Sequence, residues 1–284
     1  MVDIRHKSSG DLLATIEQSS LAGADLREMR LAGADLAGAD LRNTRMEHVD
    51  LSDADLSGAD LSGATLTSAS LNSANLNGAN LSGAKLGAGS HTLATMMLQC
   101  DLSGADLSRA DLRNVEFRGS NLVGATLTRA DMRRADFSSC NLTSATAINA
   151  LFIRANLRDA DLSQSNLSDS HLNDAVLISA DLSGAVLESC SPKGFTVINL
   201  ANFENAKLSG AKMRGVSAED SNFRNANLAD VDFSNAVLGG AILRSANVAG
   251  CNFAGVELAT VTMDFANFSQ ALNAEIPSYK ENLR

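Results

Sequence analysis

The stretch that decides the fold is residues 51–84, LSDADLSGADLSGATLTSASLNSANLNGANLSGA. Leucine recurs in it at every fifth position, from Leu51 to Leu81, and we call these positions the centres. Two residues before each centre is the small site, which is nearly always alanine. Between the small site and the centre is the outer site, which is Asp, Asn, Ser or Thr. The same five-residue pattern continues through most of the chain.

A period of five fits neither an α-helix nor a flat strand. On a helix, a step of five residues advances about 140°, so the leucines would be spread over all faces. On a flat strand, successive leucines would point to opposite faces. The pattern is consistent with a chain that turns a corner in every quintet and keeps centres and small sites inside. A path of this kind is a coil, and stacked coils form a β-solenoid.

The repeat A-[D/N]-L-x-x, as in Ala54-Asp55-Leu56-Ser57-Gly58, resembles that of the pentapeptide-repeat proteins over roughly residues 19–272. The resemblance implies an all-β fold, a right-handed quadrilateral β-helix with four pentapeptides per coil. The period alone would also permit three or six. Phenylalanines spaced 20 residues apart agree with four, and we expect each pair to stack in neighbouring coils: Phe117 and Phe137, Phe203 and Phe223, Phe233 and Phe253.

The ends of the chain leave the pattern. Residues 1–18 contain two alternating segments around Ser8-Ser9-Gly10, which predicts a β-hairpin that caps the first coil, with a short helix over 11–18 as the alternative. Residues 19–272 form the repeat domain. Residues 273–284 are expected to form a C-terminal cap with a short helix after Pro277.

The phase of the repeat breaks twice, near 87–91 and near 191–197. The first break contains Gly87 and Gly89, and the second contains Ser191-Pro192-Lys193-Gly194. After each break the centres are displaced by one residue. A one-residue bulge and a small protruding loop both account for this displacement.

Glycine is common two residues after a centre, a position that we call the corner residue. Because we assign Arg109, Arg134, Asp159 and Asn173 to this position, the sequence indicates that a glycine conformation is not required in every quintet. The four cysteines all occupy small sites, which predicts small buried hydrophobic side chains: Cys100, Cys140, Cys190 and Cys251.

Composition excludes several classes of function. The net charge is −10, which argues against direct binding of nucleic acid because that needs a basic surface. The N-terminus lacks the apolar run of a signal peptide, and no 18-residue apolar segment is present, so we expect a cytoplasmic protein without a membrane segment. The absence of Trp and the single Tyr279 argue against a roomy ligand pocket.

No catalytic, cofactor-binding or metal-binding constellation emerges from the sequence. The histidines are far apart, no CxxC pair occurs, and neither GxGxxG nor GxxxxGK[ST] is present. The spacing of the carboxylates is not that of an EF-hand. We therefore expect a protein that is not an enzyme.

Acidic outer sites are the one feature that suggests a function. In a coil of 20 residues Asp35 lies beside Asp55 and Asp40 beside Asp60, which predicts an acidic interaction face. Such a face either keeps the protein solvated or binds an unidentified protein partner, so the first hypothesis is a scaffold. The resemblance implies an alternative, since several pentapeptide-repeat proteins protect DNA gyrase from quinolones or toxins as DNA mimics. A monomer and an end-to-end dimer are both compatible with the sequence.

Overall fold

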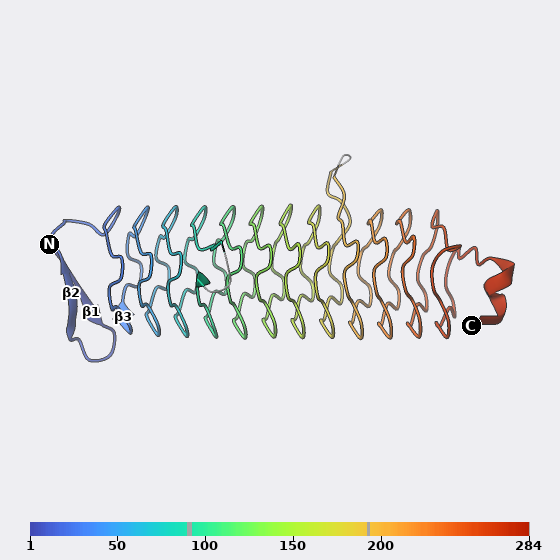
Figure 1. The fold of residues 1–284 in the computed structure, drawn as a ribbon, viewed down its shortest axis with the longest axis horizontal. Helices are drawn as coiled ribbons and strands as arrows, with labels where there is room; N and C mark the ends of the chain where they lie inside the picture. Colours follow the sequence, from blue (N-terminus) through green and yellow to red (C-terminus); the bar gives the residue numbers. More distant parts are fainter. Residues whose placement is uncertain (90–92, 192–193, 284) are drawn as a thin grey trace. The chain divides into compact units, whose positions relative to one another are not determined.

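The computed structural model describes residues 1–89, 93–191 and 194–283, of which 281–283 are described by their backbone alone. It contains two compact units, Met1–Leu142 and Thr143–Arg284, and each is a stack of coils (Figure 1). The strands are β1 (Val2–His6), β2 (Leu12–Ile16) and β3 (Ala34–Asp35), and a 3₁₀ helix, η2, spans Ser278–Leu283. In the described part of the chain no α-helix is present, and no helix is long and apolar enough to cross a bilayer.

Each coil contains 20 residues, because the outer sites of neighbouring coils form parallel bridges at that spacing, as in Asp35 with Asp55 and Asn202 with Asn222. The N–H of the centre Leu56 donates to the carbonyl of Asn75 at 2.7 Å, and the N–H of Asp55 donates to the carbonyl of Ala34 at 2.8 Å. These two bonds repeat from coil to coil. Of the alternatives open from the sequence, four quintets per coil is therefore the observed one.

The interior of each unit consists of centres and small sites. Leu56 and Ala59 are fully buried, as are nearly all their counterparts. Burial of one leucine side chain stabilises the fold by about 1.5–3 kcal/mol. The expected stacking of phenylalanines is confirmed, with ring centroids 4.7 Å apart for Phe117 and Phe137, 5.0 Å for Phe203 and Phe223 and 5.7 Å for Phe233 and Phe253.

Corner residues adopt the left-handed backbone conformation whether or not they are glycine. The φ angle is 58° at Arg109, 60° at Arg134 and 57° at Asp159. Asn173 lies one residue before its corner, which Asp174 occupies with φ 57°. The sequence-based interpretation that these positions escape a glycine-like conformation is wrong. The turn imposes that conformation, and a non-glycine side chain tolerates it at a cost of about 1–2 kcal/mol.

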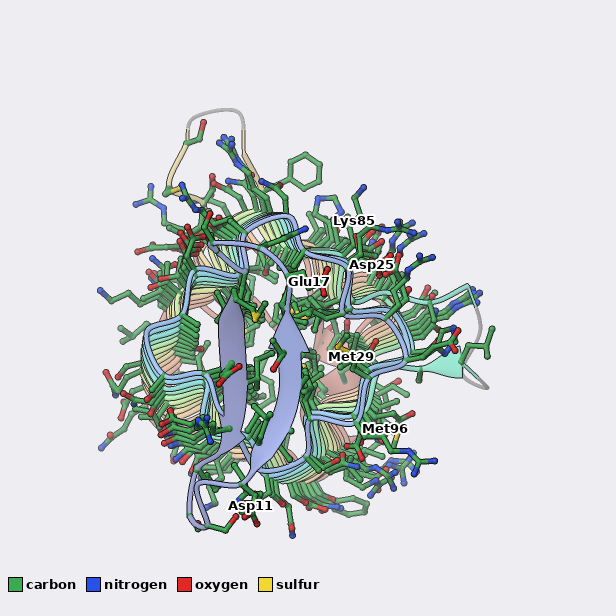
Figure 2. All side chains as sticks on the ribbon, turned by 90° about the vertical axis from the view of Figure 1, so that its left-hand side faces the viewer. Asp11, Glu17, Asp25, Met29, Lys85 and Met96 are labelled. Carbon is green, nitrogen blue, oxygen red and sulfur yellow. The ribbon has the colours of Figure 1, made fainter. Side chains whose placement is uncertain are left out.

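Both phase breaks are insertions of six residues. Bridges that span them join residues 26 apart instead of 20, as in Ser70 with Met96 and His171 with Val197. This spacing fits a protruding loop and not a one-residue bulge. Residues 90–92 and 192–193, which belong to the breaks, lie outside the described residues. The outer sites that flank the first break, Lys85 and Met96, are labelled in Figure 2.

A buried threonine stands at the small site where each insertion ends. The Thr95 hydroxyl donates toward the carbonyl oxygens of Leu86 at 2.7 Å and Leu66 at 2.9 Å, and accepts the N–H of Ser68 at 3.1 Å. At the second insertion the Thr196 hydroxyl accepts the N–H of Asp169 at 2.9 Å. Threonine thus satisfies backbone groups that the insertion displaces from the regular ladder.

Residues 2–16 form an antiparallel hairpin of β1 and β2, and β1 also pairs with β3 of the first coil. Figure 2 shows the hairpin lying across the end of the coil stack. Because β2 is a strand, the alternative of a helix over 11–18 does not occur. Strand β1 therefore covers a coil edge whose N–H and C=O groups would otherwise be unpaired.

The C-terminal helix η2 binds the last coil through side chains. Lys280 Nζ donates to the carbonyls of Leu258 at 3.1 Å and Val261 at 2.7 Å, and the Tyr279 hydroxyl donates to the carbonyl of Ala259 at 3.0 Å. Three carbonyls of this end are thus occupied by the cap.

Candidate functional site

Two rows of outer sites on successive quintets of the first unit contain the four predicted acidic residues. The Asp35 row contains Asp35, Asp55, Asn75 and Asp101, and the Asp40 row contains Asp40, Asp60, Asn80 and Asp106. We call these two rows the acidic rows. The structure brings Asp35 beside Asp55 and Asp40 beside Asp60 as parallel-bridged neighbours.

In the Asp35 row the carboxylates also stabilise the backbone turn that follows them. Asp35 Oδ1 accepts the N–H of Ala37 at 3.3 Å, and Asp55 Oδ1 accepts the N–H of Ser57 at 3.0 Å. Hydrogen bonds from Ser57 lower the pKa of the Asp55 carboxyl. Asp and Asn are therefore favoured at outer sites because they satisfy the amide two residues on.

In the Asp40 row one arginine contacts both acids. Arg42 Nε and Nη2 donate to the two oxygens of Asp40 at 2.8 Å, and Arg42 Nε lies 3.9 Å from Asp60. The hydrogen bond from Arg42 lowers the pKa of Asp40. This fork geometry fixes the Asp40 carboxylate and removes part of its negative charge.

Asparagine separates Asp55 from Asp101 and Asp60 from Asp106. Asn75 Nδ2 donates to Asp55 Oδ1 at 3.0 Å, and Asn80 Nδ2 donates to Asp60 Oδ1 at 3.1 Å. Asp101 is therefore two coils away from Asp55, and Asp106 is two coils away from Asp60. The rows combine a fixed orientation of carboxylates with reduced repulsion between like charges.

Other acidic outer sites in the first unit are paired with an arginine two residues later. Arg27 binds Asp25, Arg113 binds Asp111 and Arg133 binds Asp131, with Nη2 to Oδ2 distances of 2.6, 2.7 and 2.6 Å. The sequence signal for this pairing is Asp-x-Arg, which the net charge of the chain does not reveal. These three acids share one row of outer sites, so this side of the unit presents ion pairs, whereas Arg42 is the one arginine two residues after an acid of the acidic rows.

Three of the four cysteines are buried, as predicted, and the fourth is not. Burial raises the pKa of Cys100, Cys140 and Cys251 to about 12. Cys190 is exposed, and its thiol donates to Asp169 Oδ2 at 2.9 Å. The prediction that all four are buried fails at Cys190 because the coil leaves its regular path there. Asp169, itself 6% exposed, raises the pKa of this thiol.

Within the described residues no group of three or more His, Cys, Asp or Glu side chains is arranged to hold a metal ion. The chemistry that the acidic rows can perform is recognition: oriented carboxylates accept hydrogen bonds and attract cationic groups.

The family model for Pentapeptide repeats matches eight copies across the chain, and the chain belongs to this family. The matches cover residues 14–47, 50–87, 100–138, 120–159, 135–174, 155–191 and 201–240. Proteins of this family are in general structural or interaction proteins and not enzymes. None of the curated proteins matches the sequence.

Solved structures of the family are similar to this chain. HetL, a pentapeptide repeat protein involved in heterocyst differentiation regulation from the cyanobacterium Nostoc sp. strain PCC 7120, is 26% identical, with 89% of this chain and 91% of that chain covered and a TM-score of 0.36. QnrB1, a plasmid-mediated fluoroquinolone resistance protein, is 16% identical in a trypsin-treated form, with 64% and 84% covered and a TM-score of 0.40. Rfr23 from the cyanobacterium Cyanothece 51142 is 21% identical, with 62% and 90% covered and a TM-score of 0.20.

Proposed function

We propose that this chain is a non-enzymatic interaction protein of the cytoplasm, built as a right-handed quadrilateral β-helix, which binds a protein partner through the acidic rows. The observation that supports this most is the fixed geometry of Asp35, Asp40, Asp55 and Asp60. Each carboxylate accepts the N–H two residues on, and Asn75 and Asn80 hold Asp55 and Asp60 from the next coil. A partner would meet carboxylates whose conformational entropy is already restricted.

A second candidate is inhibition or protection of DNA gyrase by mimicry of DNA. It is favoured by the two neighbouring rows of acids, Asp35, Asp55 and Asp101 beside Asp40, Asp60 and Asp106. With coils about 4.8 Å apart, the three spacings from Asp35 to Asp101 spread these six charges over about 14 Å, or about one charge per 2.4 Å. Duplex DNA carries about one charge per 1.7 Å. The lower density and the Arg42 pair favour a general protein partner over a DNA mimic.

The test compares wild type with a variant that carries Asp35→Asn, Asp40→Asn, Asp55→Asn and Asp60→Asn. Asparagine keeps the Oδ1 acceptor for the turn, so the fold should persist while four charges are lost. A matched control loses four charges in the second unit, through Asp159→Asn, Asp161→Asn, Glu188→Gln and Glu204→Gln.

Each protein serves as bait in a lysate of the source cell, followed by mass spectrometry. We expect a partner that wild type and control retain and that the acidic-row variant loses. Retention of every partner by the variant would refute the assignment of the binding face. A supercoiling assay with purified gyrase, with and without a quinolone, separates the two candidates, because a general scaffold has no effect in it.

A further inference from the structure

The hydrogen-bonded ladder of the second unit is interrupted at one place near its C-terminal end. One side of this unit contains the Val237 row: Leu151, His171, Val197, Ser217 and Val237. Val237 forms the usual bonds toward the preceding coil, since its N–H donates to Val216 and its carbonyl accepts from Ala218. Toward the following coil, the Leu238 N–H and the Glu257 N–H have no backbone acceptor among the described residues.

The C-terminal cap holds the last coil in this open arrangement. By the regular pattern, the N–H of Gly240 would donate to the carbonyl of Ala259. That carbonyl instead accepts the Tyr279 hydroxyl, and the Gly240 N–H donates to Thr260 Oγ1 at 3.2 Å. Lys280 binds the neighbouring carbonyl of Leu258 at 3.1 Å. These hydrogen bonds of Tyr279, Gly240 and Lys280 therefore hold the two coils apart.

The separation leaves a groove of about 350 Å³ between the two coils, lined by Glu219, Asn235, Val237, Gly239, Glu257 and Thr260 among others. This size is at the lower end of ligand pockets, which are about 300–1,000 Å³. The ladder is intact before the groove, through Asn235 N–H to Ala254 at 2.7 Å, and again after it, through Leu243 N–H to Thr262 at 2.6 Å. A groove closed at both ends admits a side chain from outside, but not a continuous extended strand.

Two carboxylates give the lining of the groove a negative charge. Glu219 and Glu257 line it, and neither has an ion-pair partner in the described part of the chain. Asn199 Nδ2 approaches Glu219 Oε2 at 3.3 Å and leaves the other oxygen available. Val237, which is 50% exposed, supplies apolar surface to the lining. Two carboxylates beside an apolar surface are complementary to a long cationic side chain.

We propose that this groove binds an arginine side chain from an exposed loop of a protein partner. Arginine offers five N–H donors in a planar fork, which can bond two carboxylates at once better than the compact ammonium of lysine. Its aliphatic stem would pack on Val237. The groove is in a different unit from the acidic rows, so this proposal is independent of the proposed function.

The test follows backbone amide resonances by NMR while a peptide of sequence GSGRGSGS is added to millimolar concentration. The matched peptide carries citrulline, which has the shape of arginine without its charge. We expect the arginine peptide to shift the amides of Leu238, Gly239 and Glu257, and the citrulline peptide to bind at least about tenfold more weakly. Equal shifts with both peptides, or no shift at these amides, would overturn the proposal.

Protein variants separate this groove from general attraction to an acidic protein. The double variant Glu219→Gln with Glu257→Gln should weaken binding by at least about tenfold. The double variant Asp159→Asn with Asp161→Asn loses the same charge elsewhere in the second unit and should leave binding unchanged. Equal weakening by both pairs would show nonspecific attraction and refute the assignment.

A filled groove provides a test that does not depend on the glutamine variants. A Cβ added at Gly239 would meet Thr260 Oγ1 at 3.9 Å and Glu219 Oε1 at 4.0 Å, so there is room for a side chain. Gly239→Arg should occupy the groove from within, abolish peptide binding and raise the melting temperature. Ala249→Arg adds the same charge elsewhere and should do neither. Undiminished peptide binding by Gly239→Arg would contradict the proposal.

Discussion

The Cys190 thiol donates a hydrogen bond to Asp169, with 2.9 Å between Sγ and Oδ2. Asp169 also accepts the Ser189 hydroxyl at 2.6 Å and donates its own N–H to Thr196 at 2.9 Å. Asp169 thus holds the start of the second insertion through its carboxylate and the end through its backbone N–H. Hydrogen bonds from Cys190 and Ser189 outweigh its desolvation and lower the pKa of Asp169.

Asp169→Asn should make Cys190 more reactive toward iodoacetamide at neutral pH. The carboxylate raises the pKa of the exposed thiol, and the reactive form is the thiolate. Without the negative charge the pKa returns toward its ordinary value, and the thiolate fraction rises severalfold. Mass spectrometry of timed alkylation measures the rate, with buried Cys100 as an internal control. An unchanged or slower rate at Cys190 would contradict the role of Asp169.

Arg27→Ala should raise the titration midpoint of the Asp25 carboxyl. Hydrogen bonds from Arg27 lower the pKa of Asp25 from 3.8 to about 2. Because the folded-state pKa lies below the unfolded one, this pair stabilises the fold above about pH 4, and the contribution is lost as the pH falls through about 2. Carbon-detected NMR of the carboxyl gives the midpoint.

The neighbouring arginine provides the control for this titration. Arg45 Nη1 lies 3.5 Å from Asp25 Oδ2 and contributes less to the lowered pKa. Arg45→Ala should therefore move the midpoint less than Arg27→Ala. The reverse order would show that the Asp-x-Arg pair is not the main cause.

Leu200→Asn should stabilise the second unit. Leu200 is a corner residue with φ 61°, and 58% of its surface is exposed. The left-handed backbone conformation is unfavourable for leucine, and the small buried area of its side chain offsets little of this cost. Asparagine tolerates this conformation, and we expect a gain of about 0.5–1 kcal/mol in the free energy of unfolding. Leu200→Val should lose stability instead, because a β-branched residue fits the left-handed region worst. Chemical denaturation measures both, and a more stable valine variant would contradict the account.

Thr95→Val should loosen the end of the first insertion. Valine has nearly the shape of threonine but lacks the buried hydroxyl that accepts the Ser68 N–H and donates to the carbonyls of Leu86 and Leu66. Loss of these bonds costs about 1–3 kcal/mol. Hydrogen exchange of the Ser68 amide should accelerate at least about tenfold. Thr128→Val, at a half-exposed position, is the control and should leave that amide unchanged.

The interior of each unit could be predicted from the sequence because one rule of spacing determines it. Leucines five apart and phenylalanines 20 apart identified centres, small sites and stacked rings, and Phe117 on Phe137 confirms the length of the coil. The hairpin of residues 2–16 was accessible from its alternation and turn residues. These features depend on contacts whose spacing repeats along the chain.

Features outside the repeat could not be predicted with the same success. The phase shift of one residue did not distinguish one inserted residue from six, because both change the phase equally. The left-handed corner at Arg109 was missed because backbone geometry overrides the preference of the side chain. Asp169 with Cys190 and the groove beside Val237 depend on contacts that cross coils at irregular places, where no spacing rule applies.

The bridges that join residues 20 apart have a consequence for how such a chain can change its length. Duplication or loss of one complete coil within a unit leaves every later side chain in its own row. A binding surface therefore becomes longer or shorter, while the residues on each side of the coil stay on that side. Gain of a single quintet would instead move every later outer residue to the adjoining side. The insertions avoid this, because their extra residues leave the coil and Met96 still follows Ser70 in the same row. The gain or loss of a whole coil and the insertion of a loop that keeps the later residues in their rows are therefore the two changes that preserve a surface in this architecture.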